Sequence, residues 1–232
     1  MIVSLKFNNF RSYRDEAEFS MRALDSDFNS ESVTVVNLSD NSSIRLLNAA
    51  VIFGANASGK SNVIYALAAL SDSIKNSLNF NVKSHPFFIM PYAFDKAYQK
   101  IATSLQLEFI FDGKLYLYSV AGKGNTITAE SLKEVISGKN RIIFQRTANG
   151  KMSVGSGWPA ERSVAEDCDL LPNQLIMSWL ATKNAAGLQN IADYIGNLSI
   201  YWGNHHSGSG SDRQVVIWLL YTSPSPRDPK TS

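Results

Sequence analysis

The sequence predicts an α/β fold that combines one strand–loop–helix unit with several antiparallel strands. Residues 54–61 read Gly-Ala-Asn-Ala-Ser-Gly-Lys-Ser and match G-x-x-x-x-G-K-[ST] at every fixed position. An apolar run comes before this stretch and a helical pattern of apolar residues comes after it. Farther along, two alternating runs flank Asp112-Gly113, which is a strong signal for an antiparallel hairpin.

The glycine-rich stretch has the composition of a loop that holds phosphate groups, the P-loop. Glycine lets the backbone turn where a Cβ atom would clash, so that successive N–H groups point at phosphate oxygens. A lysine and a hydroxyl at the end of the loop suit the β- and γ-phosphates and Mg²⁺, respectively. The residues expected to contact a nucleotide are Gly54, Ala55, Asn56, Ala57, Ser58, Gly59, Lys60 and Ser61, with Ser61 also on the metal.

A P-loop requires a strand before it and a helix after it. Residues 48–53 (Asn-Ala-Ala-Val-Ile-Phe) form a short apolar run suited to a buried strand. After Lys60, apolar residues recur in steps of three or four, which is one face of an amphipathic helix. They are Val63, Leu67, Leu70, Ile74 and Leu78. The N-terminus of this helix would direct its dipole at the phosphates.

Short strands are predicted on the N-terminal side of the loop. Residues 2–7 and 16–21 are the first two strands, and residues 8–15 connect them. Residues 25–43 are rich in Ser, Asn and Asp and are predicted to be a loop that carries one strand at 33–36. Residues 44–53 then lead into the P-loop.

On the C-terminal side, residues 85–95 are predicted to be irregular because they are rich in proline and aromatic residues. The hairpin follows at 105–120, and strands at 126–135 and 141–146 extend the same sheet. Glycine-containing turns at 122–125 and 137–140 separate these strands.

The remaining part of the chain is predicted to be a mixture of loops and helices. Residues 150–159 and 205–212 are predicted to be flexible loops. Residues 170–182 and 188–198 have the apolar spacing of helices.

Two weaker metal-site patterns have simpler interpretations. Residues 109–112 (Phe-Ile-Phe-Asp) resemble a Walker B strand that ends in a Mg²⁺ ligand. Gln106 and Glu108 would put polar groups on one face, whereas a central parallel strand is buried on both faces, so the hairpin is favoured. His205 and His206 have no Cys or carboxylate partners at ligand spacing and are interpreted as loop residues.

The composition is that of an ordinary globular protein. Of 232 residues, 44% are hydrophobic and 18% charged, and the net charge of +2 argues neither for nor against nucleic-acid binding. Cys168 is the only cysteine, which excludes an intramolecular disulfide and indicates a buried structural thiol. The first residues lack a signal-peptide core, and no run reaches the roughly 18 apolar residues of a membrane span. We expect a cytoplasmic protein without a membrane partner.

The order of these motifs carries a family resemblance. A short N-terminal strand ending in Asn9-Phe10-Arg11-Ser12, a second strand and the P-loop followed by Asn62 resemble the heads of the ABC-like ATPase superclass, which includes SMC and RecF proteins. Residues 91–95, the 105–120 hairpin and residues 142–146 look like bacterial AAA family ATPases of the AAA-15/AAA-21 type, often encoded with phage-defence systems. The likeness covers about residues 1–200.

The resemblance implies an ABC/SMC-like P-loop ATPase head that binds ATP and Mg²⁺. Asn62 and Arg11 would join the nucleotide site, with Arg11 near the phosphates, although a surface arginine is an equally good interpretation. Such heads sandwich ATP in a head-to-head homodimer and act on DNA or on a co-encoded effector. The alternatives are a nucleotide-gated DNA-binding or scaffold module and an ABC transporter subunit. GTP is disfavoured because no Asn-Lys-x-Asp motif is present.

The signature motif, the Walker B Asp-Glu and the switch histidine of such ATPases are not recognisable, so the catalytic residues stay unknown. Residues 219–228 (Leu-Leu-Tyr-Thr-Ser-Pro-Ser-Pro-Arg-Asp) resemble a transposon-type sequencing adapter translated in frame. We therefore expect residues 1–218 to be a partial ATPase head and 219–232 a non-native tail. Within the head we expect a β insert at about 103–147 and a helical segment at about 170–198. Such a fragment is expected to bind ATP without efficient hydrolysis.

Overall fold

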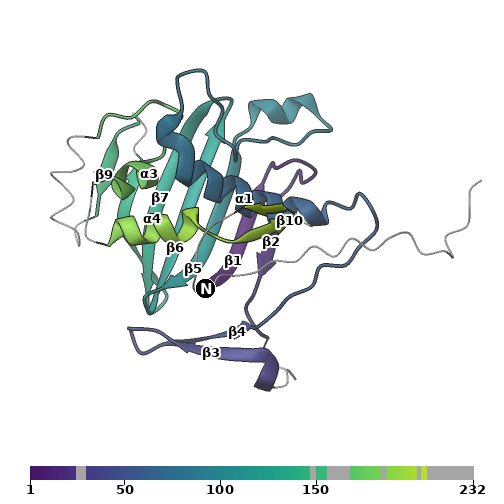
Figure 1. Cartoon of the computed structure of the whole chain (residues 1–232), viewed down its shortest axis with the longest axis vertical. Helices are drawn as coiled ribbons and strands as arrows, with labels where there is room; N and C mark the ends of the chain where they lie inside the picture. The colour runs from purple at the N-terminus through teal and green to yellow at the C-terminus, as the bar shows by residue number, and fades with distance from the viewer. Residues whose placement is uncertain (25–29, 147–149, 156–167, 184–186, 203–204, 208–232) are drawn as a thin grey trace, which may run out of the picture.

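A seven-stranded antiparallel sheet forms the centre of the computed structural model (Figure 1). The structure describes residues 1–24, 30–146, 150–155, 168–183, 187–202 and 205–207. The strand order is β2-β1-β5-β6-β7-β8-β9, and every neighbouring pair is antiparallel. The strands are β1 (Ile2–Asn8), β2 (Ala17–Ser20), β5 (Thr103–Phe111), β6 (Lys114–Lys123), β7 (Thr126–Ile136), β8 (Lys139–Arg146) and β9 (Met152–Val154).

Tight turns set the register of the central strands. Asp112 and Gly113 both have positive φ, at 48° and 69°, which matches the right-handed twist of a two-residue hairpin. Phe111 consequently pairs with Lys114 across the β5–β6 turn. Ser137 and Gly138 have φ of 47° and 76° and make the equivalent turn between β7 and β8. The predicted hairpin and both added strands are confirmed.

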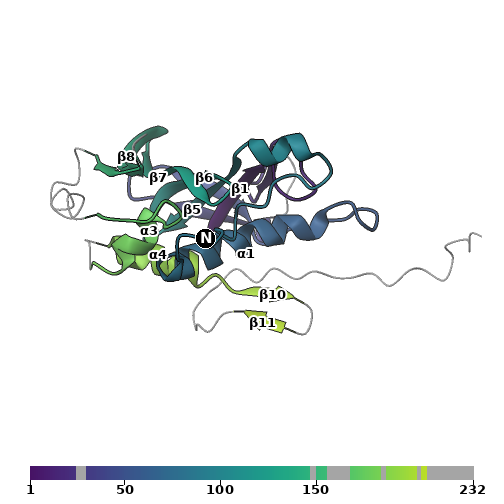
Figure 2. The same cartoon turned by 90° about the horizontal axis from the view of Figure 1, so that it is seen from above.

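Helices cover one face of this sheet (Figures 1 and 2). The largest is the one predicted after the P-loop, and it buries the apolar face expected from the spacing of Val63, Leu67, Leu70 and Ile74. Leu78 falls just beyond it, in a short 3₁₀ turn. The helical elements are α1 (Lys60–Asn76), η2 (Ser77–Asn79), α3 (Ile176–Ala181) and α4 (Leu188–Gly196), and two further 3₁₀ turns are η1 (Ser30–Ser32) and η3 (Lys96–Lys100).

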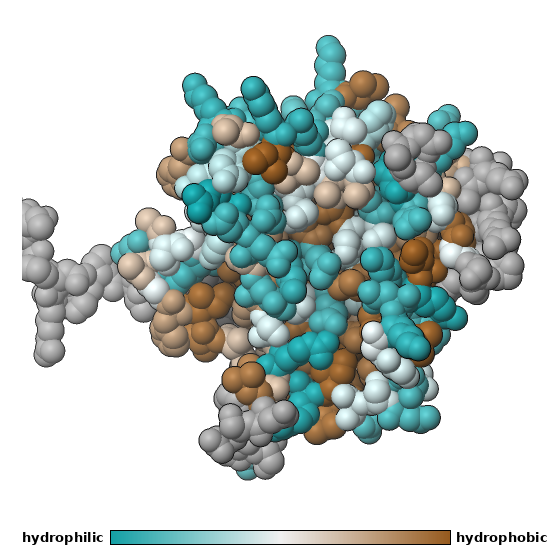
Figure 3. Space-filling model, turned by 180° about the vertical axis from the view of Figure 1, so that it is seen from behind, coloured by the Kyte–Doolittle hydropathy of each residue, from teal (hydrophilic) through white to brown (hydrophobic). Residues whose placement is uncertain are grey.

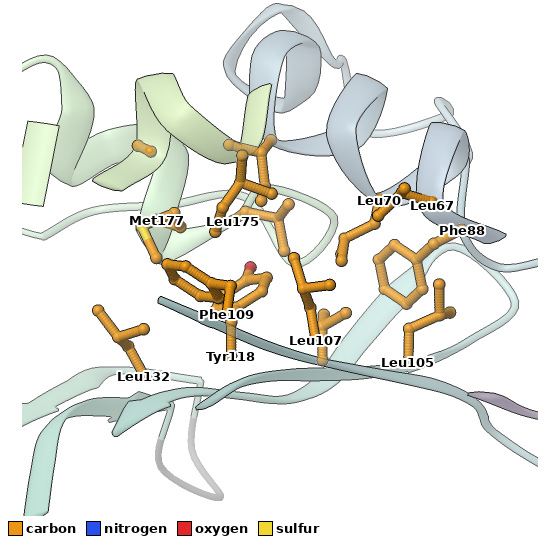
Figure 4. Close-up of a cluster of buried hydrophobic side chains, with 14 of the residues drawn as sticks. Leu67, Leu70, Phe88, Leu105, Leu107, Phe109, Tyr118, Leu132, Leu175 and Met177 are labelled. Atoms are coloured by element: carbon orange, nitrogen blue, oxygen red, sulfur yellow. The ribbon is translucent and has the colours of Figure 1, made fainter. Parts of the chain in front are cut away.

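The main core lies between the helices and the sheet (Figure 4). Leu67 and Leu70 of α1 face Leu105 and Leu107 of β5, with Phe88 beside them. Because side chains alternate along a strand, the odd-numbered residues of β5 from Leu105 to Phe109 point into this core. Burying this much apolar surface is the main force that holds α1 in place on the sheet.

The opposite face of the sheet is partly covered by a second hairpin. Strands β3 (Val33–Asn37) and β4 (Ser43–Leu47) pair with each other and pack Leu46 against Val3, Ile110 and Leu115. From behind, this side of the molecule is largely hydrophilic, with hydrophobic patches between the polar residues (Figure 3). A mixed α/β fold with a large antiparallel sheet is therefore confirmed.

The strand predicted at residues 48–53 is wrong. The chain leaves β4 at Leu47, and the segment that follows is not part of any strand. Val51 is 64% exposed and Phe53 85% exposed. A buried strand needs hydrogen-bonded neighbours on both sides. Among the described residues, no backbone hydrogen bond joins residues 49–54 to a neighbouring strand.

Three predictions on the C-terminal side also need correction. The helix expected to begin at 170 begins only at Ile176, because the buried Glu130 carboxylate accepts the N–H groups of Ile176 and Met177 there. Part of the predicted 150–159 loop forms β9, which extends the sheet beyond β8. His205–Ser207, expected in a loop, form β11 and pair with β10 (Ile200–Trp202). Residues 156–159 and 208–212 lie outside the described residues.

The N-terminal strands and the predicted β insert belong to one sheet. β1 pairs with β5 over the registers from Ile2↔Phe109 to Asn8↔Ser104. This pairing joins segments about a hundred residues apart, and it brings the β1–β2 connection to the same end of the molecule as the start of α1 (Figure 1). The fold thereby places the N-terminal loop beside the P-loop.

Candidate nucleotide site

The P-loop forms a compact turn before α1. Ser58 donates its backbone N–H to the carbonyl of Ala55 at 3.2 Å, and Asn62 donates to Gly59 at 2.8 Å. Ala57 and Gly59 both have positive φ, at 63° and 90°. Residues that leave and re-enter the helical region in this way turn successive N–H groups toward a common centre, as in anion-binding nests. Residues 53–58 are exposed, so the loop is open to a ligand from solvent.

The local geometry favours glycine at both fixed positions of the motif, most strongly at Gly59. A Cβ on Gly54 would lie 2.9 Å from the Ser58 hydroxyl oxygen, closer than carbon and oxygen approach without a shift. A Cβ on Gly59 would lie 2.6 Å from the Ser12 hydroxyl oxygen, and its φ of 90° disfavours any side chain. The first glycine therefore allows the loop to fold on itself, and the second allows the N-terminal loop to approach.

Lys60 directs its ammonium group into the loop. Its Nζ donates to the carbonyl oxygens of Gly54 at 2.8 Å and Ala55 at 2.7 Å, and lies 3.5 Å from the Ser58 hydroxyl. The start of α1 has no side-chain cap and no acidic residue in its first turn. The positive end of the helix dipole and the lysine charge therefore add at one place, which favours an anion.

Ser61 and Asn62 occupy the first turn of α1 and are both half-buried. One serine hydroxyl suits Mg²⁺, because this ion keeps several waters and takes few protein ligands when phosphate oxygens are present. Among the described residues, no group of three or more His, Cys, Asp or Glu side chains is placed to hold a metal ion by itself. The role of Ser61 as an Mg²⁺ ligand beside phosphate stays a prediction.

Arg11 lies beside α1 on the N-terminal loop. Its guanidinium carbon is 4.2 Å from the ring centroid of Tyr65, a cation–π geometry, and its φ of 53° is left-handed. Its backbone donates to Met90 and accepts from Ala93, both at 2.8 Å. The structure thus brings Arg11 to the P-loop helix, one to two turns past Lys60. Contact with phosphate stays a prediction.

Sequence reasoning missed the two residues that touch the P-loop from the N-terminal side. Ser12 accepts a hydrogen bond from the Asn62 side chain at 2.7 Å, and the Tyr13 hydroxyl lies 3.4 Å from the Gly59 carbonyl oxygen. Ser12 appeared only as the last letter of the Asn-Phe-Arg-Ser motif, and Tyr13 carried no signal. Their position depends on β1 and β5 pairing, which a local pattern does not encode.

The structure gives no functional role to Asp112 or Cys168, two of the weaker candidates for site residues. Asp112 sits in the hairpin turn at φ 48°, so its Walker B interpretation is not supported. Cys168 is a half-buried free thiol, and burial raises its pKa to about 11, which disfavours the thiolate. The side chains of His205 and His206 lie outside the described part of the structure.

Comparison with known proteins identifies the family. The family model for "AAA domain, putative AbiEii toxin, Type IV TA system" matches residues 49–165. The chain belongs to this AAA family. The matched stretch contains the P-loop, α1 and strands β5–β8, so it includes the glycine-rich loop of the candidate nucleotide site and part of the core. A search of curated proteins finds no match.

Membership in the AAA family indicates an ATP-binding domain of the ATPase class and confirms the resemblance drawn from the P-loop and hairpin. The matched stretch begins after Leu47, so the N-terminal loop that packs on the P-loop lies outside it. No helix among the described residues of this AAA protein is long and apolar enough to cross a membrane.

Proposed function

We propose that this chain binds ATP with Mg²⁺ at residues 54–62 and serves as the nucleotide-binding part of an ATPase. The main support is the position of Lys60. Its ammonium lies within 2.8 Å of two P-loop carbonyl oxygens, at the start of α1, which has no side-chain cap. Triphosphate oxygens would take the place of these carbonyls as partners of the ammonium. Phosphate is the better partner because its charge is fully negative.

The residues present supply binding and charge stabilisation. Backbone N–H groups of the loop and Lys60 would hold the phosphates, and the Ser61 hydroxyl would orient Mg²⁺. Mg²⁺, when bound, would supply positive charge beside the phosphates. Within the described part of the chain no residue is assigned to the activation of water, and we propose ATP binding with slow turnover.

We also propose that the protein belongs to the SMC/RecF-like branch and works as a head-to-head homodimer on DNA or on a co-encoded effector, as in a phage-defence system. The support is the packing of the Asn9–Tyr13 loop on the P-loop, since this loop carries the Asn-Phe-Arg-Ser motif of that resemblance. DNA affinity measured with and without ATP tests this role. Equal affinities and no ATP-dependent dimer would instead favour the scaffold alternative.

ATP binding is tested by replacing Lys60. The K60A variant should raise the Kd for Mg·ATP by at least about tenfold, because a charge-assisted contact is worth about 1.5 kcal/mol or more. Titration of the full chain with a fluorescent ATP analogue, with unlabelled ATP and GTP as competitors, gives this Kd. ATP should compete better than GTP.

The matched control is K75A. Lys75 is an exposed lysine in the last turn of the same helix, far along α1 from the loop. It has the same side chain and helical context, so K75A should leave the Kd unchanged. Equal affinity of wild type and K60A, or an equal loss in K75A, would contradict a P-loop nucleotide site.

A further inference from the structure

The N-terminal loop contacts the helix side of the P-loop. Ser12 pairs with the side chain of Asn62, and the Tyr13 hydroxyl reaches the carbonyl of Gly59. Both partners belong to the junction between the P-loop and α1. The other half of the loop is held differently, since Gly54 and Ala55 receive the Lys60 ammonium and Ala55 accepts the Ser58 N–H.

The loop that makes these contacts is itself fixed by Asn9. Asn9 is 0% exposed, and its side-chain amide donates to the carbonyls of Tyr98 and Ile101, both at 2.9 Å. Its side-chain oxygen accepts the N–H of Tyr92 at 2.8 Å, and Thr103 donates to its carbonyl. A buried amide whose donor and acceptor groups are hydrogen-bonded holds one conformation. The residues that follow Asn9 therefore have little conformational freedom.

Aromatic packing fixes Tyr13 in the same way. Its ring meets Phe7 of β1 edge-on, with centroids 4.9 Å apart. The ring also lies 3.2 Å from the place where a Cβ on Gly59 would be. The Ser12 hydroxyl is closer still to that place, at 2.6 Å. The absence of a side chain at Gly59 therefore lets a rigid loop press against the start of α1.

From these contacts we infer that Ser12 and Tyr13 are positioning residues of the nucleotide site. They hold the Gly59–Asn62 turn where the first N–H groups of α1, Lys60 and Ser61 meet the phosphates, while Gly54–Ala57 adjusts around the ligand. The inference rests on the proposed ATP binding at the P-loop. A fixed helix start lowers the ordering cost of binding, so loss of the Ser12–Asn62 hydrogen bond weakens nucleotide affinity.

A double-mutant cycle on Ser12 and Asn62 tests this. S12A and N62A should each raise the Kd for Mg·ATP about three- to tenfold, the range expected for one hydrogen bond. If they act through their mutual bond, the double variant should bind no worse than the weaker single variant. S12T, which keeps the hydroxyl, should restore most of the affinity. The unfolding midpoint of each nucleotide-free variant is measured alongside.

The matched control is the hydroxyl–amide pair on the far face of the sheet. Ser119 donates to Gln106 at 3.3 Å, and S119A, Q106A and their double variant should leave the Kd unchanged.

Three outcomes would each overturn the positioning role: a wild-type Kd for S12A, additive losses in the S12A/N62A variant, or failure of S12T to restore binding. K60A separates the two claims: if K60A weakens binding and S12A does not, only the positioning role falls. If wild type shows no Lys60-dependent binding, both fall.

Discussion

Glu130 is a buried carboxylate with several hydrogen-bond partners in the core. Its side chain is 0% exposed and accepts hydrogen bonds from the Tyr118 hydroxyl and from the N–H groups of Ile176 and Met177 at 2.8–2.9 Å. The side chain of Arg146 is 2% exposed, and its guanidinium nitrogen lies 3.4 Å from a carboxylate oxygen of Glu130 and also donates to the Gln174 carbonyl. One carboxylate thereby links β6, β7 and β8 to the first turn of α3. The sequence predicted strands and a helix here but not their shared anchor.

Removing this anchor should be costly. E130A leaves the Arg146 guanidinium buried without its charge partner, so we expect a loss of about 3–5 kcal/mol in the free energy of unfolding. E130Q keeps the size and some of the hydrogen bonds and should lose less. Urea denaturation followed by tryptophan fluorescence measures both variants.

The control is E18A, which breaks the half-exposed Lys6–Glu18 pair and should cost no more than about 1 kcal/mol. A loss in E130A as small as that in E18A would mean that the buried pair does not anchor α3.

At the scale of elements, tight turns join neighbouring strands of the sheet. Gly113 adopts φ 69° in the β5–β6 turn, and Ser39 of the β3–β4 connection donates to its carbonyl from both N–H and hydroxyl, at 2.8 and 3.0 Å. Gly138 adopts φ 76° in the β7–β8 turn, and no described atom lies within 4 Å of the place where a Cβ would be. The two turns have similar backbone conformations but differ in their surroundings.

This difference predicts unequal effects of alanine. G138A should cost about 1 kcal/mol from the left-handed backbone alone. G113A should cost more, because its Cβ would lie 3.0 Å from the Ser39 hydroxyl and would disturb the packing of the second hairpin. Thermal unfolding of the two variants gives the comparison. Equal losses would show that Ser39 yields without cost.

At the scale of the whole molecule, the sheet buries several phenols at its helix-covered face. Burial raises the pKa of Tyr116 and Tyr194 to about 12, and raises the pKa of Tyr118 well above its usual value of 10. Tyr116 and Tyr194 both stack on Phe109, with centroids 5.6 Å apart. These rings therefore keep their protons in the folded state at pH values where exposed phenols have lost them.

The stability of the protein should accordingly fall in alkali. The unfolded chain releases phenol protons near pH 10 and the folded chain only near pH 12. This contribution is therefore complete below pH 10 and is lost as the pH rises from about 10 to 12. Urea midpoints at about pH 8, 9, 10 and 11 measure the decline, and Y116F should make it less steep. Constant midpoints over this range would contradict the burial of these hydroxyls.

Local patterns were enough for much of the molecule. Asp112-Gly113 placed the hairpin, the apolar spacing after Lys60 placed α1, and the glycines marked the P-loop, because each depends on neighbours in sequence. Membership in the AAA family was likewise readable from these motifs. The partial-head boundary at 218 and the adapter-like tail stay predictions that sequencing of the source DNA would check.

The sequence by itself determined the β5–β6 hairpin, the turn between β7 and β8, and the glycine-rich loop before α1, since turn chemistry and periodicity act over a few residues. Tertiary structure alone decided that β1 pairs with β5, and through that pairing that Ser12 and Tyr13 meet Gly59 and Asn62. It also left residues 49–54 outside the sheet, although their composition suits a strand. The physical reason is that a strand forms only where a partner supplies its hydrogen bonds, and partners distant in sequence leave no local signal.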